Sequence, residues 1–157
     1  MTPNAVVHKI CAEFEGVVPK SSWGETSLFY NPENLLPNGV YFCTIKEKDG
    51  ANDKASQLNR EGVFRLAIGL PTKTYVSLFG SKPPRPVKGG IVPTGHDFTL
   101  LNELTPHPIY AWMGWVQVLS PREETFAQIL PLLKEAYSTS VDKFIKKTRS
   151  TSKLADL

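Results

Sequence analysis

The sequence predicts an α+β fold, a two-layer sandwich in which helices pack on one face of a single antiparallel sheet. Two segments, residues 40–48 and 63–70, alternate apolar and polar side chains, as half-buried strands do. Their apolar side chains share one face, whereas Lys46, Lys48 and Arg65 share the opposite face. Antiparallel sheets of this kind are covered on one side and open on the other. We therefore expect the order α-β-β-β-α-β(β)-α.

Helices are expected at both ends of the chain. The first begins at Thr2 and Pro3, because threonine caps helices and proline suits the first helical position. Its apolar positions recur at helical spacing: Val6, Ile10 and Phe14. The last helix is expected to open with a capping box at residues 120–123, and Pro131 is expected to kink or divide it. Its apolar stripe consists of Phe126, Leu130, Leu133, Tyr137, Val141 and Phe144.

The remaining elements are shorter. A β-prone stretch lies within residues 22–31, and a short helix is expected over 71–80. The side chains predicted to face the helices are Tyr41, Cys43, Ile45, Phe64, Leu66 and Ile68. The strongest strand pattern covers residues 109–119. One of its faces would hold Tyr110, Trp112 and Val116, and the other Ala111, Met113, Trp115 and Leu119; which of them is buried stays open.

Composition predicts one soluble domain. At 157 residues, with 41% hydrophobic and 21% charged residues, the chain has an ordinary globular composition. We expect a domain over residues 1–148 and a basic, flexible tail over 149–157. There is no apolar run long enough for a bilayer and no secretory signal pattern, so no membrane partner is expected. Cys11 and Cys43 fit buried thiols better than a disulfide, which favours a cytoplasmic location.

A basic and aromatic sheet face is the first candidate site. Lys46, Lys48 and Arg65 would share it with Tyr110 and Trp112, and cations beside aromatic rings hold anionic or planar ligands by charge and stacking. The net charge of +3 permits an anionic partner without requiring one. The alternative is that Trp112 is covered by the 81–108 loop and completes a second small core.

The long loop at residues 81–108 offers a second candidate site. It is dense in proline and glycine and too long for a simple connection, which is typical of a flap. Folded over the sheet, it would bring His96, Asp97 and His107 near Trp112 and form a small-molecule pocket, with or without catalysis.

Other chemistry finds little support in the residues. Histidine, cysteine and carboxylate residues do not occur at metal-ligand spacings, so no metal is expected, and Asp49 to Asp53 fits a turn better than a calcium loop. No phosphate-binding loop or nucleophile-elbow pattern occurs, and no cofactor is expected.

Short motifs are spread along the chain: Glu15-Gly16-Val17, Trp23-Gly24, Phe29, Tyr41-Phe42, the strand that holds Trp115, and Ala136-Tyr137. Together they resemble the MmcQ/YjbR-like family of small domains. The resemblance implies an α/β sandwich with an antiparallel sheet and DNA binding through a double-wing surface. Two features depart from that family: Gly114 stands where its pattern has a histidine, and the loops at 49–62 and 81–108 are longer.

Three functional hypotheses follow. The first is a non-enzymatic domain that binds nucleic acid through the basic face. The second is a pocket for an anionic small molecule beneath the 81–108 loop. The third is a domain that uses exposed aromatic residues to form a homodimer. The first two hypotheses are compatible with a monomer. Salt-sensitive binding would favour the nucleic-acid hypothesis. A concave cavity would favour the small-molecule pocket, and a large apolar patch would favour the homodimer.

Overall fold

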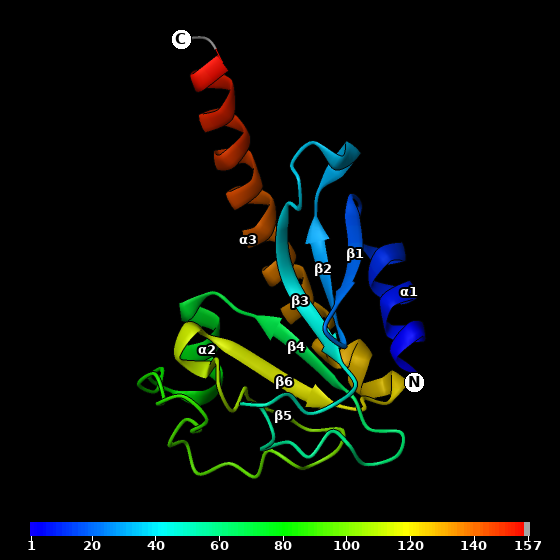
Figure 1. The fold of residues 1–157 in the computed structure, drawn as a ribbon, viewed down its shortest axis with the longest axis vertical. Helices are drawn as coiled ribbons and strands as arrows, with labels where there is room; N and C mark the ends of the chain where they lie inside the picture. Colours follow the sequence, from blue (N-terminus) through cyan, green and yellow to red (C-terminus); the bar gives the residue numbers. More distant parts are fainter. Residues whose placement is uncertain (156–157) are drawn as a thin grey trace.

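A computed structural model describes residues 1–155, with side chains described as far as Ser150. Helices pack on one face of a single antiparallel sheet (Figure 1), which confirms the predicted α+β class. The sheet order is β1-β2-β3-β4-β6-β5, and each strand is antiparallel to its neighbours. In chain order the elements are α1 (Pro3–Glu13), β1 (Val17–Ser22), β2 (Glu25–Tyr30), η1 (Pro32–Asn34), β3 (Val40–Lys46), β4 (Arg65–Gly69), α2 (Thr72–Phe79), β5 (Leu104–Pro106), η2 (Ala111–Met113), β6 (Trp115–Leu119) and α3 (Glu123–Ala155).

The hydrophobic core lies between the sheet and the pair of helices α1 and α3. Leu133 of α3 is fully buried there, as predicted, and Phe14, the C-cap residue of α1, stacks on Tyr137 with ring centroids 4.8 Å apart. The sheet contributes paired side chains from its central strands: Cys43, Ile45, Leu66, Ile68, Val116 and Val118. The opposite side of the sheet, which we call the open face, carries no helix of this pair.

The two predicted helix starts have different outcomes. Thr2 caps α1, because its Oγ1 accepts a hydrogen bond from Ala5 N at 3.1 Å. Ser120 does not cap α3. It adopts a positive φ of 43°, and its Oγ accepts from Phe64 N and donates to Gly62 O. The serine therefore fastens the end of β6 to the start of β4, and α3 begins three residues later.

Strand β1 was not predicted. Its residues include Pro19 and Lys20, and no alternating apolar pattern marks it. It pairs along its whole length with β2, which is the β-prone stretch predicted within residues 22–31. Trp23 and Gly24 form the turn between the two strands, with positive φ at both residues. The sheet thus has one more strand at its edge than the sequence pattern indicated.

A bulge in β3 corrects the predicted orientation of Tyr41. Leu28 pairs with Cys43 and Phe29 pairs with Tyr41, so Phe42 is an extra residue without a partner in β2. Phe42 turns to the helices and packs against Phe14 and Tyr137. Tyr41 consequently lies on the open face, where it is 48% exposed, instead of facing the helices as predicted.

The predicted strand over 109–119 is wrong in its first half. Tyr110 precedes the short 3-10 helix η2, and Gly114 then adopts a left-handed conformation with φ of 88°. A Cβ atom at Gly114 would lie 2.8 Å from Leu70 O, so only glycine fits this approach. The strand β6 therefore begins at Trp115, with Trp115 and Gln117 on the open face and Val116 and Val118 toward the helices.

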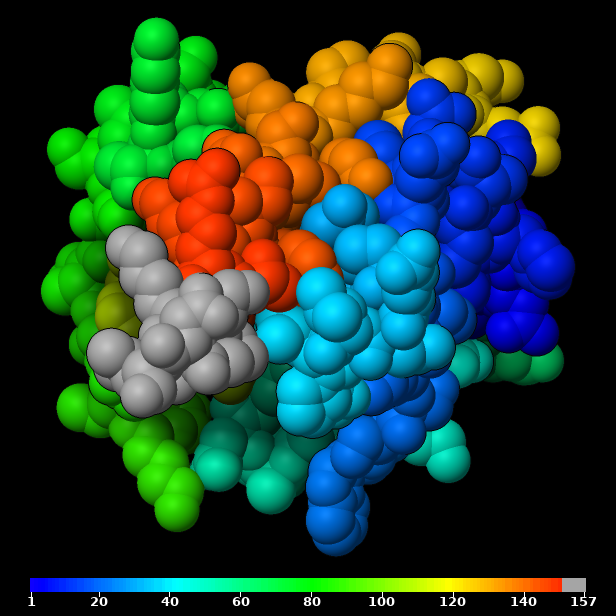
Figure 2. Space-filling view, turned by 90° about the horizontal axis from the view of Figure 1, so that it is seen from above, coloured from blue at the N-terminus to red at the C-terminus, as the bar shows by residue number. Residues whose placement is uncertain are grey.

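The two long loops fold onto the open face. Arg60 Nη2 donates to Thr99 O at 2.9 Å, and Gln117 Nε2 donates to Phe98 O at 3.2 Å, so both loops are tied to the sheet and to each other. In Figure 2 the blue β1–β2 hairpin and the green segment after α2 project on the same side of the molecule, with the teal loop after β3 between them.

Helix α3 continues without interruption through Pro131 as far as Ala155, so the proline does not divide it. Figure 2 shows turns of this helix that precede residue 151, in orange and red, beside the cyan segment that connects β2 to β3. In this region Tyr30 contacts Phe144, with ring centroids 5.1 Å apart. Part of the predicted flexible tail, residues 149–157, thus belongs to this helix; residues 156–157 lie outside the described residues. Cys11 and Cys43 are free thiols.

Candidate ligand-binding cleft

The open face holds a cleft of about 830 Å³. Its floor consists of side chains from β3, β4 and β6. One wall comes from β2 and the hairpin turn at Trp23, and the opposite wall comes from residues 85–89 and 107–113. A volume of this size lies within the range of pockets that bind small molecules.

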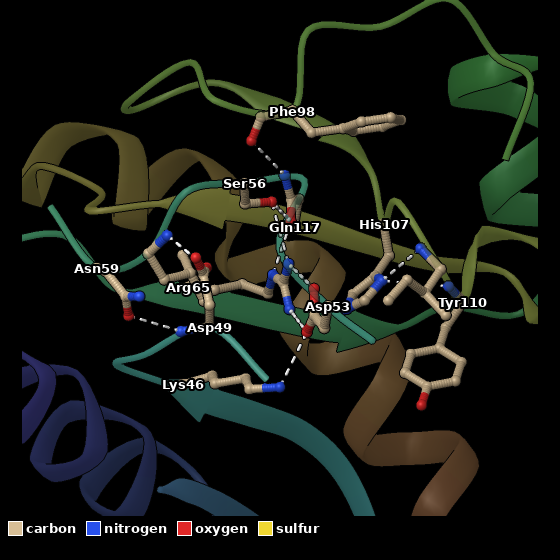
Figure 3. Close-up of polar contacts among 12 residues, drawn as sticks. Lys46, Asp49, Asp53, Ser56, Asn59, Arg65, Phe98, His107, Tyr110 and Gln117 are labelled. Atoms are coloured by element: carbon tan, nitrogen blue, oxygen red, sulfur yellow. Dashed lines mark hydrogen bonds and ion pairs between the residues drawn. The ribbon is translucent and has the colours of Figure 1, made fainter. Parts of the chain in front are cut away.

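A buried polar network forms the deepest part of the floor (Figure 3). Arg65, which is only 2% exposed, makes a bidentate ion pair with Asp53 at 2.6 and 2.8 Å. Its Nε donates to Gln117 Oε1 at 2.7 Å and its Nη2 donates to Ser56 Oγ at 3.0 Å. Lys46 Nζ donates to Asp53 Oδ2 at 3.0 Å. Each buried charge is therefore paired, as a buried charge requires.

A tight turn places the Asp53 carboxylate. Gly50 and Asp53 exchange backbone hydrogen bonds of 3.0 and 3.2 Å, which confirms the turn predicted at residues 49–53. Burial raises the pKa of Asp53, but the hydrogen bond and charge of Arg65, aided by Lys46, outweigh it and hold that pKa well below its ordinary value. Asp53 is consequently ionised throughout the physiological range, and it neutralises one of the two cations on the floor.

His107 lies beside this network, with its ring between Asp53 and Tyr110 (Figure 3). Its Nδ1 accepts hydrogen bonds from the backbone N–H groups of Ile109 and Tyr110, both at 3.1 Å. Burial, followed by the charge of Arg65, holds the pKa of His107 well below its ordinary value. The imidazole is therefore neutral at pH 7, and because Nδ1 is an acceptor, the proton resides on Nε2. His107 thus offers a fixed N–H donor.

Aromatic rings form the other end of the cleft. Trp115 lies against Gly69, where a Cβ atom would come within 2.8 Å of the indole, and its ring is 5.7 Å from that of Tyr41. The guanidinium of Arg85 lies 4.9 Å from the centre of the Trp112 ring. Burial, followed by the charge of Glu25, raises the pKa of Tyr41, so its hydroxyl stays protonated at neutral pH.

The structure brings together five of the eight residues proposed from the sequence. The cleft is lined by Lys46, Arg65, His107, Tyr110 and Trp112. Lys48 instead lies beside a separate hollow next to Phe64. His96 is exposed and packs against Phe79, and Asp97 is exposed and accepts hydrogen bonds from Thr99. Of the three loop residues expected near Trp112, only His107 is therefore in the cleft.

Several residues of the cleft were missed or misjudged. The sequence placed Asp53 only in a turn, and nothing in its sequence context indicates an arginine partner on β4. Tyr41 was placed on the wrong face because a bulge leaves no mark in a period-two pattern. The position of Trp115 could have been inferred from Gly69, since a glycine within a strand often marks a place where another group packs closely on the backbone.

Neither metal ligation nor membrane crossing is indicated in the described residues. No group of three or more histidine, cysteine or acidic side chains that could hold a metal ion occurs among them. Within the same part of the chain, no helix combines the length and apolar character that a bilayer crossing requires.

The fold and the cleft define an α+β domain with a pocket of ligand size on the open face of its sheet. Residues 1–149 match the model of DUF6194, a family of unknown function, and the chain belongs to that family. No curated protein and no solved structure matches the chain significantly. The resemblance to the MmcQ/YjbR-like family remains a prediction.

Proposed function

We propose that this protein binds a small organic anion that carries a flat apolar group, and that the cleft on the open face is the binding site. The observation that carries this proposal is the combination of aromatic walls with an excess of cations around one cavity. Pockets for small molecules have this composition, mostly apolar walls with a few placed polar groups.

Charge favours an anion. The lining residues include four cations, Lys46, Arg65, Arg85 and Lys88, against the two carboxylates of Glu25 and Asp53. In the described part of the chain, neither Arg85 nor Lys88 is ion-paired with a carboxylate. These two side chains are therefore available to a ligand.

The aromatic residues favour a flat group. Tyr41 and Trp115 are tilted by only 33° to one another and form a nearly continuous apolar surface. Trp112 lies on the opposite side under the guanidinium of Arg85. A planar group between these rings would gain dispersion and stacking, and its anionic substituent would lie near the cations.

The chemistry at the floor favours binding over catalysis. His107 holds its proton on Nε2 while Nδ1 is occupied, so it is not in the state of a general base. Asp53 is ionised but committed to Arg65 and Lys46. The Nε2–H group of His107 is well suited to orient an acceptor atom of a ligand.

The nucleic-acid hypothesis receives less support from the geometry. Arg65 is buried beneath the surface and paired, so it is not available to a phosphate, and Lys48 lies outside the cleft. Lys46 is the remaining member of the expected basic stripe, and it too is bonded to Asp53.

Titration calorimetry with matched probes tests the proposal. We expect 2-naphthyl phosphate and 2-naphthalenesulfonate to bind, and the neutral 2-naphthamide to bind more weakly. The double variant Arg85→Gln/Lys88→Gln should weaken binding of the anions roughly two- to thirtyfold, because each exposed ion pair contributes about 0.2–1 kcal/mol. Lys48→Gln/Lys143→Gln removes the same charge from exposed positions outside the cleft and should leave the affinity unchanged.

Two outcomes would overturn the proposal. The first is that no naphthyl probe binds at millimolar concentration, or that the neutral amide binds as well as the anions. The second is salt-dependent binding of a short DNA duplex by a protein that binds none of the probes, which would favour the nucleic-acid hypothesis instead.

A further inference from the structure

Trp23 occupies the tip of the β1–β2 hairpin, and its side chain is 100% exposed. No ring contact, cation–π contact or side-chain hydrogen bond involves it among the residues that the structure describes. It nevertheless lines the cleft, as do Ser22, Glu25 and residues 85–89. A large apolar side chain without such a contact in the described part of the chain requires an explanation.

The backbone at Trp23 is also unfavourable for a tryptophan. Its φ is 56° and that of Gly24 is 74°, so both central residues of the turn are left-handed. Two-residue hairpin turns of this kind favour Asn-Gly, Asp-Gly or Gly-Gly, because a bulky L residue with positive φ is strained. Neither exposure nor strain benefits the free protein, and such strain is concentrated at ligand sites.

We propose that Trp23 is a ligand-contacting residue, which stacks on the flat group of the bound molecule at the mouth of the cleft. This inference rests on the proposed function and extends it. Trp23 stands on the β2 side of the cleft, and Trp112 stands on the far side with Arg85.

The hairpin geometry explains how Trp23 reaches the ligand. Glu25 pairs with Lys46, so the turn projects beyond the end of β3 where the floor carries its cations. Figure 2 shows this blue hairpin and the green segment after α2 projecting on the same side of the molecule. An indole at the tip therefore stands at the mouth of the cleft, where it can contact the flat group of a ligand whose anionic group lies near the cations.

The variant Trp23→Asn separates a role in binding from a role in the fold. Asparagine suits the first position of an Asn-Gly turn, so the substitution relieves strain and should raise the melting temperature by a few degrees, about 2–4 °C. The same variant should weaken binding of 2-naphthyl phosphate roughly five- to tenfold through loss of stacking. A residue that only supports the fold would not change stability and affinity in opposite directions.

Two further variants serve as controls. Trp23→Phe keeps an aromatic ring at the tip and should retain most of the affinity. Leu35→Asn removes an exposed apolar side chain outside the cleft and should leave the affinity unchanged. With 5-fluorotryptophan incorporated, the ¹⁹F resonance that disappears in Trp23→Phe identifies Trp23, and it should shift when 2-naphthyl phosphate is added to the wild-type protein.

The outcomes distinguish this inference from the proposed function. If no probe binds the wild-type protein, the proposed function fails and this inference fails with it. If the probe binds wild type and Trp23→Asn equally and the ¹⁹F resonance does not move, the role of Trp23 is refuted while the proposed cleft stands. Unchanged affinity together with loss of a dimer in sedimentation would instead assign Trp23 to a contact between two copies of the chain.

Discussion

At the scale of single residues, Asp53 contributes both to the stability of the fold and to the charge of the cleft. Its carboxylate binds Arg65 through two hydrogen bonds and Lys46 through a third. Arg65 is too deeply buried to be solvated by water, so its charge depends on this partner. The same carboxylate limits the positive charge that the floor presents to a ligand.

We expect Asp53→Asn to lower the free energy of unfolding by about 3–5 kcal/mol, because it leaves the Arg65 charge buried without a counter-ion. Urea denaturation measures the change. Asp142→Asn, which removes an exposed carboxylate from α3, serves as the control and should stay within about 0.5 kcal/mol of wild type. A loss below 1 kcal/mol for Asp53→Asn would show that water or another group solvates Arg65.

His107 makes stability depend on pH in a defined direction. Its pKa is well below the ordinary value in the folded protein, first because of burial. Below about pH 6.5 the unfolded chain takes up a proton that the folded protein does not, so unfolding is favoured as the pH falls. We expect the free energy of unfolding to fall by about 1.4 kcal/mol for each pH unit below 6.5, down to the folded pKa.

Urea denaturation between pH 5 and pH 7 checks this slope. His107→Asn removes the titrating group while keeping an acceptor for the backbone, and it should reduce the slope. His96→Gln replaces an exposed histidine and should retain it. An equal slope in wild type and His107→Asn would contradict the assignment.

At the scale of elements, the helices and central strands could be predicted because their periodic patterns reflect burial. The apolar stripe of α3 correctly indicated Leu133, and the alternation of β4 correctly indicated Leu66 and Ile68. The failures occur where tertiary contacts override the local pattern. Gly114 and the backbone bonds to His107 interrupt the expected strand, and the bulge at Phe42 reverses Tyr41.

The packing of α3 on the sheet can be tested at one residue. Leu133 is fully buried in the core cluster, so Leu133→Ala should lower the free energy of unfolding by about 2–5 kcal/mol through lost contacts and a cavity. Ile145→Ala, at an exposed position farther along the same helix, should change it by less than about 1 kcal/mol. Similar effects of the two substitutions would contradict the packing.

At the scale of the whole molecule, the sequence predicted the layers but only part of the cleft. Alternation along β3 and β4 identified Lys46 and Arg65 on the open face, and it could not reveal that both bind Asp53 from the intervening loop. The shape of the cleft depends on how the loops at residues 47–64 and 80–103 fold against the sheet. Long-range hydrogen bonds, such as the one from Arg60 to Thr99, hold these loops in place, and a periodic sequence pattern does not predict such bonds.

The buried network of Arg65, Asp53, Gln117 and Ser56 has a consequence for how this protein tolerates change. Its members bond to one another and link the 53–56 loop to β4 and β6. A substitution among them that changed the ligand preference of the floor would therefore also lower the stability of the fold. Residues at the rim of the cleft contribute little to the stability of the fold, because Trp23 and Val87 are exposed and lie outside the core. Affinity and selectivity can therefore be engineered at the rim with small effects on stability. Libraries that vary residues 22, 23 and 85–88 over an unchanged floor, and that keep Gly24 and Gly89 with their positive φ, should yield folded proteins with altered ligand preference.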